Sequence, residues 1–337
     1  MTSSEVLLGA DVGGTSMSAG LVTHDGRVLV SRSQPTHGPG GGDALARLLA
    51  LAAEVAAVAR DRGDRVTGAG AGLPGVVDAA TGTVGSEAHH VPELIGVPVA
   101  RLLAERVGAP AFIDNDVNAL AVGEWLWGAG RGARSLVLMA IGTGVGGGII
   151  LDGRLHRGAG GFGGELGHVP VKLDGRPCIC GARGCLKAYV AGGDLAAAAS
   201  QRLGRTVDAP ALFDLADKGD AAAAAVLDEA LEALAAGLTI IVNGLNPERL
   251  LIAGSVGRAF ASREADLRAR LARRAYAGAV ATTRVAFIDL DKDTTVRGGA
   301  ALVAYNQMGG PEMAPHTPPR SAAPRRSRGA PREPDSR

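Results

Sequence analysis

The stretch that decides the fold is Val-Leu-Leu-Gly-Ala-Asp-Val-Gly-Gly-Thr at residues 6–15, followed by an alternating apolar run at 17–22 and Asp-Gly-Arg at 25–27. An apolar run, a glycine-rich turn, a second run and a tight turn predict a β-hairpin followed by a third strand. The same order returns at residues 136–154, where Gly-Thr-Gly-Val-Gly-Gly-Gly occupies positions 142–148. Two such units predict two similar halves, each opening with a hairpin that carries a glycine loop.

The composition indicates a globular chain without a strongly charged surface. Of the 337 residues, 46% are hydrophobic and 20% are charged, and 35 basic residues against 34 acidic ones leave a net charge of +1. A chain this close to neutral has no overall positive potential that would attract DNA or an anionic membrane. An aromatic content of only 3% disfavours stacking on single-stranded nucleic acid. The N-terminus lacks a basic and apolar leader, and no segment suits a spanning helix, so we expect a cytoplasmic protein without membrane partners.

Segments typical of helices and strands alternate along most of the chain, which indicates an α/β fold. Short apolar runs predict strands at 66–71, 111–113 and 249–253. Helical spacing predicts helices at 43–62, 99–107, 118–127, 194–203, 221–242 and 263–276, and a last helix that begins near residue 296. Residues 309–337, rich in Pro, Arg, Ser and Ala, predict a disordered tail, which is either a solvated extension or a segment whose arginines bind nucleic acid.

The second glycine run contains Gly-x-Gly-x-x-Gly, but its context disfavours a dinucleotide-binding site. That site needs the glycines to open a helix, whereas this run leads into an apolar strand and a tight turn. A hairpin turn of glycines can instead point backbone N–H groups at phosphate, and Thr15 and Thr143 add hydroxyl donors. The alternative is a pair of ordinary glycine turns.

Two acidic motifs and one cysteine cluster are candidates for chemistry. Asp-Asn-Asp at residues 114–116 follows a strand and precedes a helix, where either aspartate could be a base or only a helix cap. Glu165 and His168 are three residues apart and could share a helical face or simply lie on the surface.

The three cysteines of the chain, Cys178, Cys180 and Cys185, lie within eight residues, and His168 is the nearest histidine upstream. Three thiolates and an imidazole form a closed tetrahedral set, which predicts structural Zn²⁺ rather than a disulfide framework. The alternative is three reduced, unrelated cysteines. With no open coordination position, zinc here would act by fixing His168.

The motifs, taken in order, closely resemble the ROK family (repressors, open reading frames, sugar kinases), and especially its bacterial glucokinases. The resemblance covers roughly residues 5–308 and rests on the motifs at residues 11–15, 72–75, 115–118, 142–148, 165–168 and 178–185. It implies an α/β, two-lobed actin/hexokinase-like (ribonuclease H-like) fold that holds a sugar and ATP in its cleft. The expected first lobe is residues 1–117 plus 296–308, the last helix packing back on this lobe. The expected second lobe is residues 118–295, which contain the zinc motif at 168–185. It also implies a homodimer or homotetramer.

The resemblance assigns roles to the matching residues. Asp116 falls on the catalytic base, and Asn115, Glu165, His168 and Gly75 fall on the sugar site, His168 also being a metal ligand. Asp11 falls on the acid associated with Mg²⁺. The residues implied to bind ATP are Asp11, Gly13, Gly14, Thr15, Gly142, Thr143, Gly144, Gly254 and Ser255.

Two positions depart from the glucokinase pattern. The family usually has Glu after Cys-Leu, but this chain has Lys187, which either swings away, pairs with Glu165 or changes the pocket toward an anionic or N-acyl sugar. His90 stands where glucokinases typically carry an Asn that touches the sugar.

The sequence therefore favours ATP-dependent phosphorylation of a sugar hydroxyl, with glucose giving glucose 6-phosphate. The rival hypotheses are a kinase for another hexose or an N-acyl amino sugar, a catalytically weak sugar sensor, and a transcriptional regulator. Few residues precede position 6, so we expect no DNA-binding domain. Polyphosphate stays open as an alternative donor to ATP.

Overall fold

The computed structural model describes residues 4–309, and the tail predicted at 309–337 lies outside this range except for Gly309. Two five-stranded sheets have the same strand order and the same directions. In the first sheet the order is β3-β2-β1-β4-β7, and in the second it is β10-β9-β8-β11-β12. In each sheet the first three strands of this order are antiparallel to their neighbours. The last two strands run parallel to β1 in the first sheet and to β8 in the second. The prediction of two similar halves is therefore confirmed.

The predicted strands begin and end close to the expected positions, and β5, β6 and β12 come in addition to them. Those of the first sheet are β1 (Glu5–Val12), β2 (Ser16–Val22), β3 (Val28–Pro35), β4 (Arg65–Leu73) and β7 (Ala111–Asn115). Those of the second are β8 (Leu136–Ile141), β9 (Val145–Leu151), β10 (Arg154–Leu155), β11 (Arg249–Ala253) and β12 (Arg284–Phe287). A small hairpin consists of β5 (Val77–Asp78) and β6 (Thr83–Val84).

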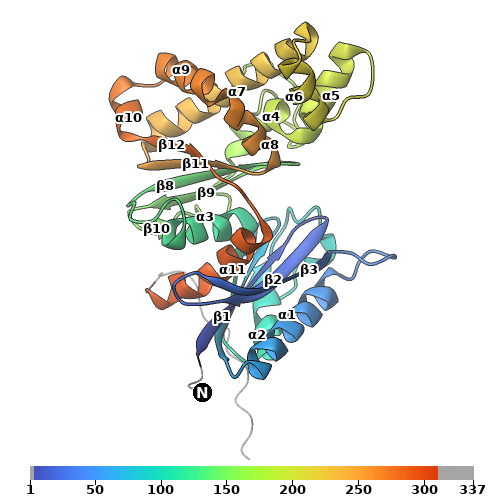
Figure 1. Ribbon diagram of the computed structural model, residues 1–337, viewed down its shortest axis with the longest axis vertical. Coiled ribbons are helices and arrows are strands. Elements are labelled where there is room, and N and C mark those ends of the chain that lie inside the picture. The colour runs from blue at the N-terminus through green and yellow to red at the C-terminus, as the bar shows by residue number, and fades with distance from the viewer. Residues whose placement is uncertain (1–3, 310–337) are drawn as a thin grey trace, which may run out of the picture.

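The helices lie in three layers around the two sheets (Figure 1). On the outer face of the first sheet lie α1 (Ala44–Asp61) and α2 (Val99–Val107). Between the sheets lie α3 (Asp116–Trp127) and α11 (Lys292–Gln307). The second sheet is covered by α4 (Lys187–Val190), α5 (Gly192–Leu203), α6 (Ala209–Asp217), α7 (Ala221–Leu245), α8 (Ser255–Ala259), α9 (Glu264–Arg274) and α10 (Ala277–Thr282). Short 3₁₀ helices are η1 (Pro92–Leu94), η2 (Leu166–His168) and η3 (Phe260–Arg263).

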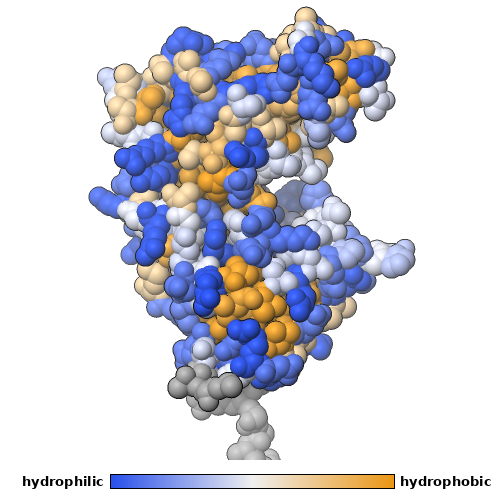
Figure 2. Space-filling view, viewed as in Figure 1, coloured by the Kyte–Doolittle hydropathy of each residue, from blue (hydrophilic) through white to orange (hydrophobic). Residues whose placement is uncertain are grey.

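The middle layer joins the two halves of the molecule. α3 contacts β9 and β8 of the second sheet, and also α11, which packs on β1 and β4 of the first. Figure 2 shows a hollow at one side, between the upper and the lower half. Among residues 4–309 no helix is long and apolar enough to cross a membrane.

One prediction about the second glycine run is wrong. The sequence predicts that the whole run at 142–148 forms the turn, but only residues 142–144 do, and β9 begins at Val145. The reason is packing against α3: a Cβ on Gly146 would lie 2.8 Å from Val117, and one on Gly148 would lie 2.5 Å from the Ala121 Cβ. Glycine in β9 therefore lets the helix that begins at Asp116 lie directly on the second sheet.

Candidate active site

The predicted base, Asp116, is the first residue of α3, directly after β7. The side chain of Asn115 caps the helix, since its Oδ1 accepts hydrogen bonds from the backbone N–H groups of Val117 (2.9 Å) and Asn118 (3.2 Å). Of the two alternatives left open for the aspartates, the capping role is therefore taken by Asn115, and the half-buried Asp116 is available for chemistry.

Asp116 lies beside two other carboxylates predicted for the site. Burial is the main cause that raises the pKa of Asp116 to about 6, and the charge of Glu165 raises it further. Burial also raises the pKa of Asp11 to about 7, with a second contribution from the charge of Asp116, while the Thr295 hydroxyl opposes the shift. The structure thus brings Asp11, Asp116 and Glu165 together from three segments far apart in the sequence. A base whose pKa is near neutrality can accept a proton at physiological pH.

The turn at residues 72–75 lies against the same site. A Cβ on Gly72 would lie 3.1 Å from the Asp116 Cα and 3.5 Å from Asp11 Oδ1, so only glycine lets β4 come this close. Asn115 Nδ2 donates to the carbonyl of Gly75 (3.0 Å), where φ is +89°. This bond holds Gly75 beside Asn115, so two residues predicted for the sugar site lie together.

The first glycine loop is a closed turn whose tip faces solvent. The Gly13 N–H donates to the Ser16 carbonyl (2.9 Å), the buried Thr36 hydroxyl donates to the Gly13 carbonyl (2.6 Å), and Gly14 and Thr15 are exposed.

The second loop has space around its glycines. A Cβ on Gly142 or Gly144 would meet no other atom within 4 Å, so packing does not require glycine there. Thr143 at its tip is exposed. Open space next to exposed backbone suits a loop that phosphate oxygens approach closely.

Gly254 and Ser255, which the resemblance implies to bind ATP, lie next to this second loop. Gly254 has φ +87°, and a Cβ there would lie 2.4 Å from the carbonyl oxygen of Ile141, the residue before the loop. Sequence reasoning missed Gly192, whose N–H donates to the Gly142 carbonyl (2.8 Å). No local signal could have found it, because the contact joins segments fifty residues apart.

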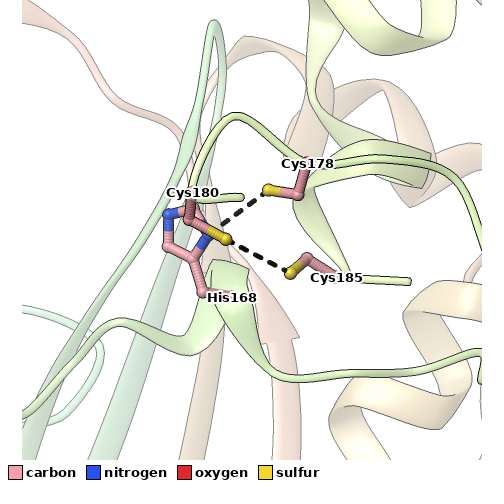
Figure 3. A group of neighbouring side chains, drawn as sticks. All are labelled: His168, Cys178, Cys180 and Cys185. Carbon is pink, nitrogen blue, oxygen red and sulfur yellow. Dashed lines mark hydrogen bonds between the residues drawn. The ribbon is translucent and has the colours of Figure 1, made fainter. Parts of the chain in front are cut away.

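The cysteine cluster has the geometry of a metal site (Figure 3). One ligand atom from each of His168, Cys178, Cys180 and Cys185 lies within 4.8 Å of the others. His168 Nδ1 is 3.5 Å from Cys178 Sγ, and the sulfurs of Cys180 and Cys185 are 3.7 Å apart. Zinc–sulfur bonds of about 2.3 Å in a tetrahedron give a sulfur–sulfur distance of about 3.8 Å, so the residues fit Zn²⁺.

His168 connects this cluster to the carboxylates. It ends η2, and its Nδ1 faces the cysteines while its Nε2 lies 3.9 Å from Glu165 Oε2. The two nitrogens thus face two different groups, which is the arrangement that a metal ligand with a second contact needs.

The two departures from the glucokinase pattern have definite partners. Lys187 Nζ binds Asp194 Oδ2 in the first turn of α5 at 2.8 Å, so its predicted pairing with Glu165 is wrong and the side chain swings away. His90 packs on the first glycine loop: a Cβ on Gly14 would lie 3.0 Å from its Cγ. The His90 side chain is therefore placed beside a predicted phosphate loop.

The family model described as ROK family matches residues 7–306. The chain belongs to the ROK family. Among ROK relatives, it is 33% identical to a glucokinase from Thermotoga maritima over 88% of this chain and 96% of that one. It is 31% identical to an N-acetylmannosamine kinase from Citrobacter koseri (75% and 84% covered) and 28% identical to a xylose repressor from Caldicellulosiruptor bescii (74% and 65% covered).

Solved ROK structures have the same fold. A ROK hexokinase from Thermus thermophilus has a TM-score of 0.77 and 31% identity, covering 90% of this chain and 99% of that one. A ROK glucokinase from Streptomyces griseus, solved with glucose and AMPPNP, has a TM-score of 0.69 and 27% identity, with 88% and 98% covered. The two-domain α/β, actin/hexokinase-like fold expected from the sequence is thereby confirmed.

Proposed function

We propose that this chain is an ATP-dependent sugar kinase that converts glucose to glucose 6-phosphate. The observation that carries the proposal is Asp116 itself: a half-buried carboxylate with a pKa of about 6 directly after β7, next to Asp11 near the end of β1. The similarity to the glucokinases of Thermotoga maritima and Streptomyces griseus supports the substrates.

In the proposed reaction, Asn115, Glu165 and His168 hold the sugar hydroxyls. One carboxylate oxygen of Asp116 accepts the proton of the attacking hydroxyl as that oxygen forms a bond to the γ-phosphorus. The bond from the γ-phosphorus to the bridging oxygen breaks, and ADP leaves with that oxygen. The backbone N–H groups of the two glycine loops, together with Thr15 and Thr143, bind the phosphate oxygens.

Asp11 is the residue that would hold Mg²⁺. Asp11 is half-buried next to a second carboxylate, Asp116, whose charge together with burial raises the pKa of Asp11, and a hard divalent cation with oxygen ligands would compensate both charges. When bound with the nucleotide, Mg²⁺ would neutralise negative charge on the β- and γ-phosphate oxygens. Zn²⁺ at the cysteine cluster has a structural part in the proposal, because four protein ligands leave it no open position.

We further propose that the chain up to residue 117, with 296–308, and residues 118–295 form the two lobes that close on the substrates. The middle layer of α3 and α11 lies between the two sheets and is the place where such a movement would be hinged.

A kinase for another hexose or an N-acyl amino sugar is the second candidate. It is favoured by the Lys187–Asp194 ion pair, which leaves a position expected to accept sugar hydrogen bonds without a carboxylate, and by the similarity to an N-acetylmannosamine kinase. Because Asp194 compensates the lysine charge, an anionic sugar is the less favoured substrate.

An assay of ADP release across a panel of hexoses and N-acyl amino sugars tests both candidates. The proposal requires sugar-dependent ADP release with glucose, and release only with an N-acyl amino sugar would support the second candidate. Tight sugar binding without turnover would instead indicate a sugar sensor.

A further inference from the structure

A buried ion pair connects the two halves of the molecule directly beneath the candidate site. Asp114, at the end of β7, is 1% exposed, and Arg157, which follows β10, is 8% exposed. Arg157 Nε donates to Asp114 Oδ2 at 2.7 Å, and Nη2 lies 2.7 Å from the same oxygen. Asp114 lies in a strand of the first sheet and Arg157 in the segment that follows the second sheet's edge strand, so this contact joins the two halves.

The other oxygen of Asp114 fixes the turn that carries the proposed base. Asp114 Oδ1 accepts hydrogen bonds from the backbone N–H of Asn115 (2.8 Å) and from Asn118 Nδ2 (2.9 Å). These donors flank Asp116 on both sides. A shift of the Asp114 carboxylate would therefore move Asn115 and the first turn of α3 together.

Arg157 in turn starts the loop that leads to Glu165. The Arg157 carbonyl accepts a hydrogen bond from the Gly163 N–H (2.7 Å), which closes residues 158–163 into a compact loop. Gly164 follows with φ +152°, and a Cβ there would lie 2.3 Å from the Gly147 carbonyl oxygen. Glu165 thus projects from a segment whose base is fixed by Arg157.

We infer that Asp114 and Arg157 are a positioning pair that sets the placement of the base Asp116 relative to the sugar ligand Glu165. A buried ion pair contributes little net stability compared with apolar residues of similar volume, because desolvation offsets the attraction. Its geometric effect is larger here, since the Asp114 carboxylate contacts both the turn that carries Asp116 and Arg157, from which the segment to Glu165 starts. This inference rests on the proposed function.

The test compares Arg157→Met with a matched control, Arg270→Met, in the full-length, metal-loaded protein. Arg270 lies on α9 of the outer layer, its side chain is 11% exposed, and it is paired with Asp228, Glu232 and Asp266. Both substitutions remove a cation that is mostly covered by protein from its carboxylates, but only Arg157 lies at the site. Thermal unfolding, sugar binding by calorimetry and the KM values for sugar and ATP are measured for each variant.

We expect Arg157→Met to lower kcat/KM for the sugar about 100-fold, a loss typical of a small misplacement of reacting groups, and to weaken sugar binding while KM for ATP changes less than about threefold. Arg157→Lys should recover about tenfold of the loss, because it keeps the charge but not the planar donors. Arg270→Met should lower the melting temperature and leave both KM values unchanged.

Equal effects of Arg157→Met and Arg270→Met on kcat/KM, at similar losses in melting temperature, would overturn the inference. So would a parallel rise in KM for ATP and for sugar. Wild-type protein that phosphorylates no sugar would instead refute the proposed function, so the two failures are distinguishable.

Discussion

Replacing Asp116 by Asn should abolish turnover while making the free protein more stable. The amide oxygen can still accept the hydrogen bond that Asp116 Oδ1 receives from the Val117 N–H at 2.9 Å, so the start of α3 is preserved. The amide has almost the same shape but cannot accept the hydroxyl proton. Loss of a general base lowers kcat by about 10²–10⁴-fold, which corresponds to about 3–5 kcal/mol of barrier.

The stability effect follows from the pKa of Asp116, which burial raises from 3.8 to about 6. Between these two values the folded state binds more protons than the unfolded state, so wild-type stability falls as pH rises through this window and is constant above it. The full shift corresponds to about 3 kcal/mol, and since the side chain is only half-buried we expect about 1–3 kcal/mol. Because the amide of Asp116→Asn does not ionise, the variant does not lose this stability as pH rises.

The assays are ADP release at saturating substrates and thermal unfolding without nucleotide or Mg²⁺, at pH 4 and pH 8. We expect the variant to melt a few degrees above wild type at pH 8 and close to it at pH 4. Asp11→Asn is the control for the second carboxylate, and it should chiefly weaken the use of Mg·ATP. Turnover of Asp116→Asn within tenfold of wild type, or a melting temperature below wild type at pH 8, would refute the reasoning.

Three further predictions concern the same site. The kcat/KM for the sugar should fall about tenfold per pH unit below a pH near 6, because protonated Asp116 cannot act as a base; a flat profile from pH 8 to pH 5 would count against it. Metal analysis of undisturbed protein should find about one Zn²⁺ per chain, and Cys178→Ser should lose it and raise KM for the sugar several-fold through His168; less than about half a zinc per chain would contradict the assignment. Lys187→Glu should release Asp194 from its ion pair and improve kcat/KM for glucose relative to N-acyl amino sugars, and an unchanged ratio across the sugar panel would show that this position lies outside the pocket.

The sequence predicts the framework of the molecule well, because short-range patterns determine it. The two hairpins and the helix at Val99–Val107 lie where apolar periodicity places them, and the repeated order of motifs anticipates the repeated sheet topology. Sequence reasoning missed the short elements α4, α6, α10, β5, β6 and β12, most of which pack against longer ones.

The contacts that assemble the site could be predicted only in part. Asn115, rather than an aspartate, caps α3, and the side chain of Asp114, still within β7, instead binds Arg157. The partner of Lys187 is Asp194, which is nearby in the sequence, and not the more distant Glu165. Such choices depend on side-chain directions and on contacts between segments tens of residues apart, which a single sequence does not encode locally.

The most direct measurement of the central claim is product formation by the wild-type, metal-loaded protein with Mg·ATP and glucose. The account predicts one ADP and one glucose 6-phosphate per turnover, with no ADP release when the sugar is omitted. Absence of sugar-dependent ADP release with glucose would contradict it.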